Sequence, residues 1–195
     1  MKRLFDIIFS GAGLVICSPF FILLSLLIVC TSGFPVFYLQ KRVGLGGADF
    51  SLFKFRTLKK EADKDGLLTV GKKDPRLTVA GYFLRRFKLD ELPQLFNVLT
   101  GDMSVVGPRP EVRKYVELYS DVQKKVLAVR PGITDYASIE YSKENELLAR
   151  AVNPEEFYIK QVMPAKLDLN LKYISEQSFT TDLKIILKTI MKIFF

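Results

Sequence analysis

The chain contains 195 residues with a mass of 22.2 kDa, the size of one domain, and its net charge of +8 favours anionic partners such as nucleic acid, anionic lipid or phosphorylated small molecules. It has no histidine, which excludes Ser-His-Asp and Cys-His nucleophile systems and HExxH metal sites. Its two cysteines, Cys17 and Cys30, lie in apolar sequence, so chemistry must use carboxylates, lysine, arginine, tyrosine or hydroxyls, with a metal that prefers oxygen ligands.

The first predicted element is a membrane helix within residues 1–33. Lys2 and Arg3 precede an apolar run from Leu4 to Thr31, and residues 7–40 carry no charged side chain. The run is longer than the apolar part of a signal peptide and lacks a cleavage pattern. About 20 apolar residues suffice to cross a bilayer.

A kink is expected at Ser18 and Pro19, because proline removes a backbone donor and serine can bond a freed carbonyl. Basic residues flank the helix on both sides, whereas a crossing helix should carry them mainly on one side. These flanking residues are Lys2, Arg3, Lys41, Arg42, Lys54 and Arg56. A re-entrant helix that returns to the same membrane face and a kinked crossing helix remain alternatives at this point.

Residues 34–195 are expected to form a compact, mostly helical α+β domain with a small β-hairpin. The hairpin is predicted from a β-prone run at 34–38, glycines at 44–47 and an alternating run at 50–56. Helices are predicted at 78–86, 92–99, 111–129 and 154–173, the last interrupted near Pro164, and an exposed loop at 59–76.

The C-terminal segment, residues 182–195, has the pattern of an amphipathic helix in the membrane interface. Lys184, Lys188 and Lys192 recur every four residues, while most other positions are apolar. The alternative is a terminal helix that packs on the core of the protein.

Candidate catalytic residues are the adjacent acids Asp90 and Glu91, which precede Pro93. Proline suits the first turn of a helix, where the helix dipole would keep a carboxylate ionised as a nucleophile or metal ligand. Arg85, one turn earlier, adds a cation for a phosphate. Simple helix capping is the alternative interpretation of the acidic pair.

Two proline-flanked arginines are candidate phosphate ligands. Arg109 lies between Pro108 and Pro110, and Arg130 precedes Pro131, so stiff loops would present both guanidinium groups. Either arginine alone could occupy an ordinary surface turn. The chain contains neither G-x-G-x-x-G nor a Walker A sequence, and no pattern typical of nucleic-acid binding.

Several motifs taken together resemble the bacterial sugar transferase family, the small monotopic phosphoglycosyl transferases. The strongest are Lys88–Leu99 (KLDELPQLFNVL), residues 101–104 (GDMS) and residues 107–110 (GPRP). Further matches are residues 40–44 (QKRVG), 54–57 (KFRT), 74–76 (DPR) and 130–134 (RPGIT).

The resemblance implies transfer of a phospho-sugar from a UDP-sugar to polyprenol phosphate, with release of UMP and use of Mg²⁺. Asp90 would be the nucleophile that attacks the sugar-linked phosphate, and Glu91 would bind the metal with Asp90 and assist the acceptor. Arg85 and Arg109 would bind phosphate. The helix would be re-entrant, bent at Ser18-Pro19.

Other matching blocks make Lys54, Arg56 and Arg130 candidate nucleotide- or substrate-binding residues. After Thr134 many members of the family continue Gly-Trp/Leu-Ala-Gln-Val, whereas this chain has Asp135-Tyr136-Ala137-Ser138. This departure leaves the sugar open.

The expected location is the cytoplasmic face of a bacterial inner membrane, with phospholipid, UDP-sugar and polyprenol phosphate as partners and a homodimer as a further possibility. Two alternatives remain. One is a non-catalytic basic scaffold bound to anionic lipid. The other is a direct transferase that uses the two acids only as metal ligands.

Overall fold

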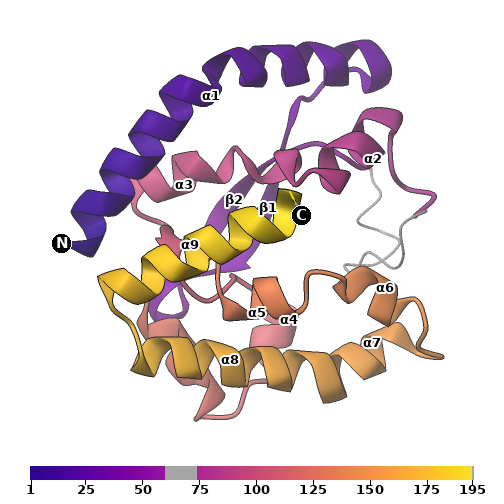
Figure 1. Cartoon of the computed structure of the whole chain (residues 1–195). Coiled ribbons are helices and arrows are strands. Elements are labelled where there is room, and N and C mark those ends of the chain that lie inside the picture. The colour runs from indigo at the N-terminus through magenta and orange to yellow at the C-terminus, as the bar shows by residue number, and fades with distance from the viewer. Residues whose placement is uncertain (60–73, 195) are drawn as a thin grey trace.

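The computed structural model describes residues 1–59 and 74–194, and it has the expected α+β fold. A long N-terminal helix, α1 (Lys2–Ser32), lies along one side of a body of shorter helices and two small sheets (Figure 1). Most of the predicted loop 59–76 lies outside the described residues.

The predicted β-hairpin is confirmed. Strand β1 (Phe37–Val43) pairs antiparallel with β2 (Asp49–Phe55), and Phe37 lies opposite Phe55. The turn between them, η1 (Leu45–Gly47), places Gly46 at a φ of 65°, a conformation that favours glycine. The first strand begins later and ends later than the β-prone run 34–38 suggested.

The helices predicted at 78–86 and 92–99 are present as α2 (Val79–Arg86) and α3 (Gln94–Thr100). The Thr78 side chain accepts a hydrogen bond from the Gly81 amide and so caps α2. Between the two helices lies a short 3₁₀ turn, η3 (Leu89–Glu91).

The single helix predicted at 111–129 is wrong. This segment forms a short helix, α4 (Arg113–Val116), and a separate 3₁₀ helix, η4 (Gln123–Ala128). The Ser120 amide donates to the Gln123 side chain, and the Gln123 amide donates to the Ser120 hydroxyl. This reciprocal capping box forms a turn over residues 120–123 that leads into η4 and therefore divides the predicted helix.

Helices α5 (Tyr136–Glu140) and α6 (Glu144–Leu148) precede a longer helical run that is interrupted where the sequence predicted. The run consists of α7 (Pro154–Phe157), a π-helical turn η5 (Tyr158–Val162) and α8 (Met163–Ser175). Pro164 lies in the first turn of α8, directly after the π turn. The interruption thus occurs at the position where a proline cannot donate a backbone hydrogen bond.

The C-terminal helix α9 (Phe179–Phe194) begins earlier than expected and has two different faces. Ile185 and Ile186 are buried in one core cluster with Val98 of α3 and Tyr173 of α8, and Figure 1 shows α9 between these two helices. An apolar stripe on the other face is exposed, and it contains Leu183, Leu187, Ile190 and Met191. Helix α9 therefore packs on the core and also presents an unpaired apolar face.

Helix α1 bends near its middle, as Figure 1 shows. Pro19 lies inside the helix, and the neighbouring Ser18 hydroxyl donates to the carbonyl of Val15 at 2.8 Å. That carbonyl lies four residues before Pro19 and is the one that a proline cannot satisfy. By length and composition the helix could cross a membrane, with a mean hydropathy of 2.7 in its most apolar window and 11% of that window buried.

Both ends of α1 are bound to the body by polar contacts. At the first end, the Asp6 carboxylate is buried and accepts hydrogen bonds from the Ser104 hydroxyl and the Val105 amide, each at 3.0 Å. At the last end, the Arg56 guanidinium donates to the carbonyls of Ser32, Gly33 and Phe34. The same body therefore holds both ends of the helix.

Candidate active site

The acidic pair lies on the 3₁₀ turn η3, where three elements meet. Glu91 contacts two cations from other parts of the chain. Arg109 donates through Nη1 to Glu91 Oε2 at 3.1 Å and through Nη2 to Glu91 Oε1, so the pair is bidentate. Lys54 Nζ, from strand β2, lies 3.8 Å from Glu91 Oε1. The fold thus brings together Lys54, Asp90, Glu91 and Arg109, which lie in three separate sequence motifs.

The loop after β3 crosses the segment that leads into β4, and this crossing holds Arg109 in place. Strand β3 (Ser104–Val106) pairs in parallel with β4 (Gly132–Thr134), and Gly107, the first residue of the loop after β3, lies directly against Gly132. The Gly107 amide donates to the Thr134 carbonyl at 3.1 Å, and the Gly132 amide donates to the Pro108 carbonyl at 3.0 Å. These hydrogen bonds fix the Pro-Arg-Pro motif against strand β4, which follows Arg130 and Pro131 in the chain.

The charges around Glu91 keep it ionised. Burial alone would raise the pKa of Glu91, but the positive charges of Arg109 and Lys54 outweigh burial and hold this pKa well below its usual range. Burial lowers the pKa of Lys54 to about 8, although the Glu91 carboxylate opposes that change. The Glu91 charge is thus compensated on two sides.

Asp90 lies in a different environment from the one that the sequence suggested. Pro93 is the N-cap residue of α3, so the acids lie in the preceding 3₁₀ turn rather than in the first helical turn. Asp90 is only 6% exposed. Burial, and next the neighbouring Glu91 charge, raise the pKa of Asp90, while Lys54 and Arg85 act in the opposite direction. The cations around Asp90 therefore offset the rise in its pKa only in part, and the net shift is opposite to the one expected from a helix dipole.

Arg85 lies on the other side of the acidic pair. Its Nε donates to the Thr57 hydroxyl at 2.9 Å. Burial lowers the pKa of Arg85, and the Asp90 charge is the largest influence that raises it. Arg85 is thus part of the same electrostatic cluster as Asp90.

Two other predicted site residues make contacts elsewhere. The Arg56 guanidinium binds the chain at the end of α1, as described above, and Arg56 Nε is buried without a hydrogen-bond partner in the described part of the chain. Arg130 Nε donates to the Gly101 carbonyl at 2.9 Å on the surface. Within the described part of the chain, neither guanidinium binds Asp90 or Glu91.

One buried residue of the site was noted in the sequence only as a departure from the family pattern. Asp135 Oδ2 accepts a hydrogen bond from the Arg109 backbone amide at 3.0 Å, and its Oδ1 accepts one from the Ser138 amide. Asp135 is the N-cap residue of α5, but no helix was predicted there from the sequence, and no motif linked this residue to Arg109.

The residues of the site fit a magnesium ion in part. Asp90 and Glu91 supply two adjacent carboxylates, and Mg²⁺ is commonly bound by one or two carboxylates together with substrate phosphates. Among residues 1–59 and 74–194 no group of three or more acidic, histidine or cysteine side chains could hold a metal alone. Such an ion would therefore need oxygens from a phosphate ligand.

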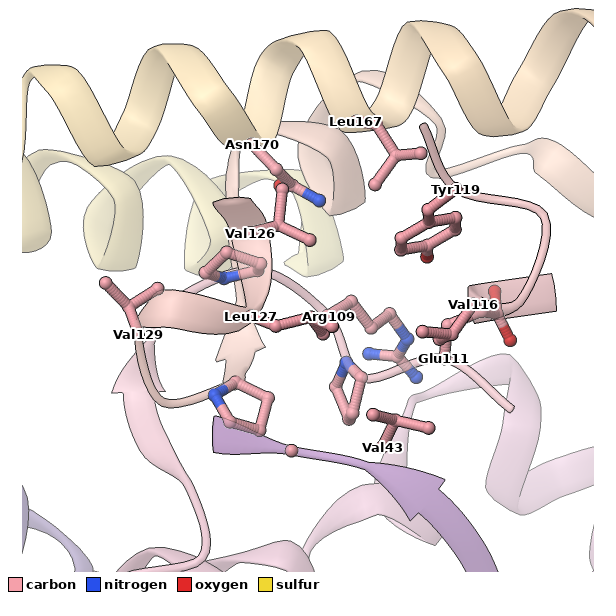
Figure 2. A pocket seen from close by; sticks show the side chains of 14 residues that line it. Val43, Arg109, Glu111, Val116, Tyr119, Val126, Leu127, Val129, Leu167 and Asn170 are labelled. Atoms are coloured by element: carbon pink, nitrogen blue, oxygen red, sulfur yellow. The ribbon is translucent and has the colours of Figure 1, made fainter. Parts of the chain in front are cut away.

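A small cavity lies behind the Arg109 loop (Figure 2). Its volume is about 20 Å³, close to the space that one water molecule needs. Its lining is mostly apolar, with Tyr119, Val126 and Leu167 around the stem of Arg109, and Asn170 Oδ1 is buried there without a hydrogen-bond partner among the described residues. The cavity is too small for a nucleotide or a sugar.

Comparison with known proteins identifies the family. The sequence profile described as bacterial sugar transferase matches residues 1–195. An uncharacterised sugar transferase from Bacillus subtilis, EpsL, is 39% identical over 194 residues, which cover 99% of this chain and 87% of that protein. A putative undecaprenyl-phosphate N-acetylgalactosaminyl 1-phosphate transferase from the same organism is 47% identical over 121 residues, 62% of this chain and 68% of the relative.

A UDP-glucose:undecaprenyl-phosphate glucose-1-phosphate transferase from Klebsiella pneumoniae is 39% identical over 195 residues. The match covers 98% of this chain but only 39% of that longer protein. The full-length profile match and the extensive similarity to EpsL agree with the motifs around Asp90 and Arg109. The chain therefore belongs to the bacterial sugar transferase family.

Proposed function

We propose that this protein transfers a sugar 1-phosphate from a UDP-sugar to undecaprenyl phosphate and releases UMP. The observation that carries the proposal is the cluster of Asp90, Glu91, Lys54 and Arg109, which places two carboxylates between cations that suit a diphosphate. Relatives whose names state this activity on UDP-glucose or undecaprenyl phosphate support it.

In the proposed reaction an Asp90 oxygen attacks the sugar-linked phosphorus of the donor. A bond forms between that oxygen and phosphorus, the bond to the bridging oxygen breaks, and UMP leaves with the electron pair. A phosphate oxygen of undecaprenyl phosphate then attacks the same phosphorus and releases the Asp90 carboxylate. Arg109 and Lys54 offset the negative charge of the phosphate oxygens in both steps.

Asp90 and Glu91 are the residues that would hold Mg²⁺ in this proposal, together with donor phosphate oxygens. The ion, when bound, neutralises charge on the diphosphate and on the leaving UMP. Glu91 is paired with Arg109 in this structure, so a cation held by Glu91 would leave the Arg109 guanidinium available to bind phosphate.

The direct test is a panel of UDP-sugars supplied with undecaprenyl phosphate and Mg²⁺ to the detergent- or lipid-embedded protein, with UMP release as the readout. We expect UMP release with one or a few of the UDP-sugars. Release beyond one UMP per protein molecule should require the lipid acceptor. A non-catalytic lipid-binding scaffold would release no UMP with any donor, and that result would refute the proposal.

We further propose that α1 is re-entrant, with the body on the cytoplasmic face where a UDP-sugar would be met. A straight helix of 31 residues would be about 46 Å long, against a hydrocarbon core of about 30 Å. Asp6 at one end and Ser32 at the other both bind the same body. Because the body lies on one side of the membrane and binds both ends of the helix, both ends should lie on that side.

The exposed face of α9 supports a second membrane contact. Leu183, Leu187 and Met191 are exposed beside Lys184 and Lys188, so an apolar stripe lies next to a cationic one. This arrangement suits a helix in the plane of an anionic membrane surface.

The topology predicts how two cysteines should react with an impermeant maleimide in spheroplasts. One cysteine is inserted after Met1 and, in a second protein, Ala48→Cys marks the hairpin; both carry Cys17→Ala and Cys30→Ala. We expect both sites to be protected in intact spheroplasts and labelled after lysis. Labelling of either site before lysis would overturn the re-entrant topology. Pro19→Ala restores the missing donor to Val15 and should expose the first cysteine in a fraction of molecules.

Arg109→Lys should lower the transfer rate about tenfold or more. Lysine keeps the charge but not the bidentate fork, and hydrogen bonds to charged groups contribute roughly 1.5–3 kcal/mol. The measurement is the initial rate of UMP release, with Arg113→Lys, a surface pair of Asp49, as the matched control. Equal rates for Arg109→Lys and the wild type would mean that the guanidinium only completes a surface turn.

A further inference from the structure

We infer that Asp135 is the positioning residue that fixes Arg109 for phosphate binding. The inference rests on the proposed function of Arg109 as a phosphate ligand, and it begins from the contact between Asp135 Oδ2 and the Arg109 amide at 3.0 Å. Asp135 has no exposed surface, so it contacts no substrate itself and acts through Arg109.

The Pro-Arg-Pro motif gives this one hydrogen bond unusual importance. Pro108 and Pro110 have no backbone N–H, so Arg109 supplies the only amide donor of the three residues. Asp135 is the acceptor for that donor. Without this acceptor, the single backbone N–H of the motif would have no hydrogen bond, and the backbone of Arg109 would no longer be held in place.

The carboxylate does more than cap helix α5. Its Oδ1 accepts from the Ser138 amide at 2.6 Å, which is the usual N-cap contact, and an asparagine could make that bond equally well. Only a carboxylate offers a second acceptor oxygen in the same place, and this oxygen binds Arg109. The buried negative charge is also favourable next to the Arg109 cation, because Asp135 is one of the charges that raise the pKa of Arg109.

The neighbouring strand completes the attachment. Arg109 Nη1 donates to the Ile133 carbonyl at 3.3 Å as well as to Glu91. The segment 133–135 therefore binds Arg109 at both its backbone and its guanidinium. This arrangement determines where the remaining guanidinium donors point.

The test is Asp135→Asn, alone and combined with Arg109→Ala. Asparagine keeps the cap on Ser138 but turns an amide donor toward the Arg109 N–H, so the loop must shift. A misplacement of about 1 Å can reduce an enzymatic rate on the order of 100-fold, and we expect UMP release to fall about 10- to 100-fold in the single variant. In the Arg109→Ala background the same substitution should reduce the rate less than twofold further.

A purely structural role predicts a different pattern. If the two residues acted independently, the fold losses in rate of the two single variants would multiply in the double variant. The effect of losing a helix cap alone is measured with Asn153→Ala, which removes the side-chain cap of α7 away from the site. We expect Asn153→Ala to lower the thermal midpoint slightly and to leave UMP release unchanged. Multiplicative losses, or an Asp135→Asn rate within twofold of the wild type, would overturn the inference.

Hydrogen exchange separates this inference from the proposed function. In a peptide that contains residues 107–111, the exchangeable amides belong to Gly107, Arg109 and Glu111, because the two prolines have none. Asp135→Asn should increase exchange of the Arg109 amide, whether or not the protein releases UMP from any donor. Unchanged exchange would refute the positioning role, whereas a wild-type protein without UMP release would refute only the function.

Discussion

Asp90→Asn should abolish sugar-phosphate transfer, with a loss of about 1,000-fold or more in the rate of UMP release. An amide has no anionic oxygen that can form a bond to phosphorus, so the first chemical step is lost rather than slowed. Asparagine has nearly the same shape, and we expect the thermal midpoint and the membrane association to remain close to those of the wild type. Asp121→Asn, at an exposed position paired with Lys124, is the matched control.

A direct view of the same step comes from intact-protein mass measurement without the lipid acceptor. The wild-type protein should gain the mass of one phospho-sugar from the donor, and Asp90→Asn should not. A ternary mechanism with Asp90 as a metal ligand only would give no such adduct in either protein. Activity of Asp90→Asn within tenfold of the wild type would exclude Asp90 as the nucleophile.

Gly132→Ala should have the second-largest effect. A Cβ atom at residue 132 would lie 2.1 Å from the Gly107 nitrogen and 2.4 Å from its oxygen. Both contacts are with backbone, which cannot rotate away as a side chain can, so the two loops must separate and Arg109 must move. We expect a loss of about 100-fold in UMP release and about 3 kcal/mol in the free energy of unfolding.

The control for Gly132→Ala is Gly11→Ala in α1. A Cβ at Gly11 meets nothing within 4 Å, so this variant should keep the rate and should not lower the thermal midpoint, since alanine favours a helix interior more than glycine does. If Gly132→Ala behaves like Gly11→Ala, the crossing loops are not what holds Arg109.

The motifs around Asp90 and Arg109 could be recognised from the sequence because adjacent acids and a proline-flanked arginine are local patterns. The contact of Lys54 with Glu91 depends on how the hairpin packs on η3, which no local pattern records. Burial also could not be derived from the sequence, and it reverses the expected direction of the Asp90 pKa shift. The family resemblance grouped these residues, but only the fold gave their distances.

Arginine was the residue type most difficult to interpret from sequence. Arg56 and Arg109 both lie in family motifs, yet Arg56 binds three main-chain carbonyls while Arg109 binds a carboxylate. Main-chain acceptors leave no trace in the amino-acid sequence. The break before η4 was different, because the Ser-x-x-Gln capping box at residues 120–123 stands in the sequence and was overlooked when one helix was predicted over 111–129.

The attachment of α1 at both ends has a consequence for the order of events during synthesis. Lys2 pairs with Asp182 at 2.6 Å, a residue 180 positions later in the chain. At about 5–20 residues per second, Asp182 is made roughly 9–36 s after Lys2. During that interval the Lys2 side chain lacks its partner, and Asp6 lacks its own until Ser104 and Val105 are made, roughly 5–20 s after Asp6 at the same rate. Charged side chains resist passage through a bilayer. The start of α1 therefore carries two charges without their final partners during the early part of synthesis, which would favour the proposed topology, with this end of the helix on the side of the ribosome.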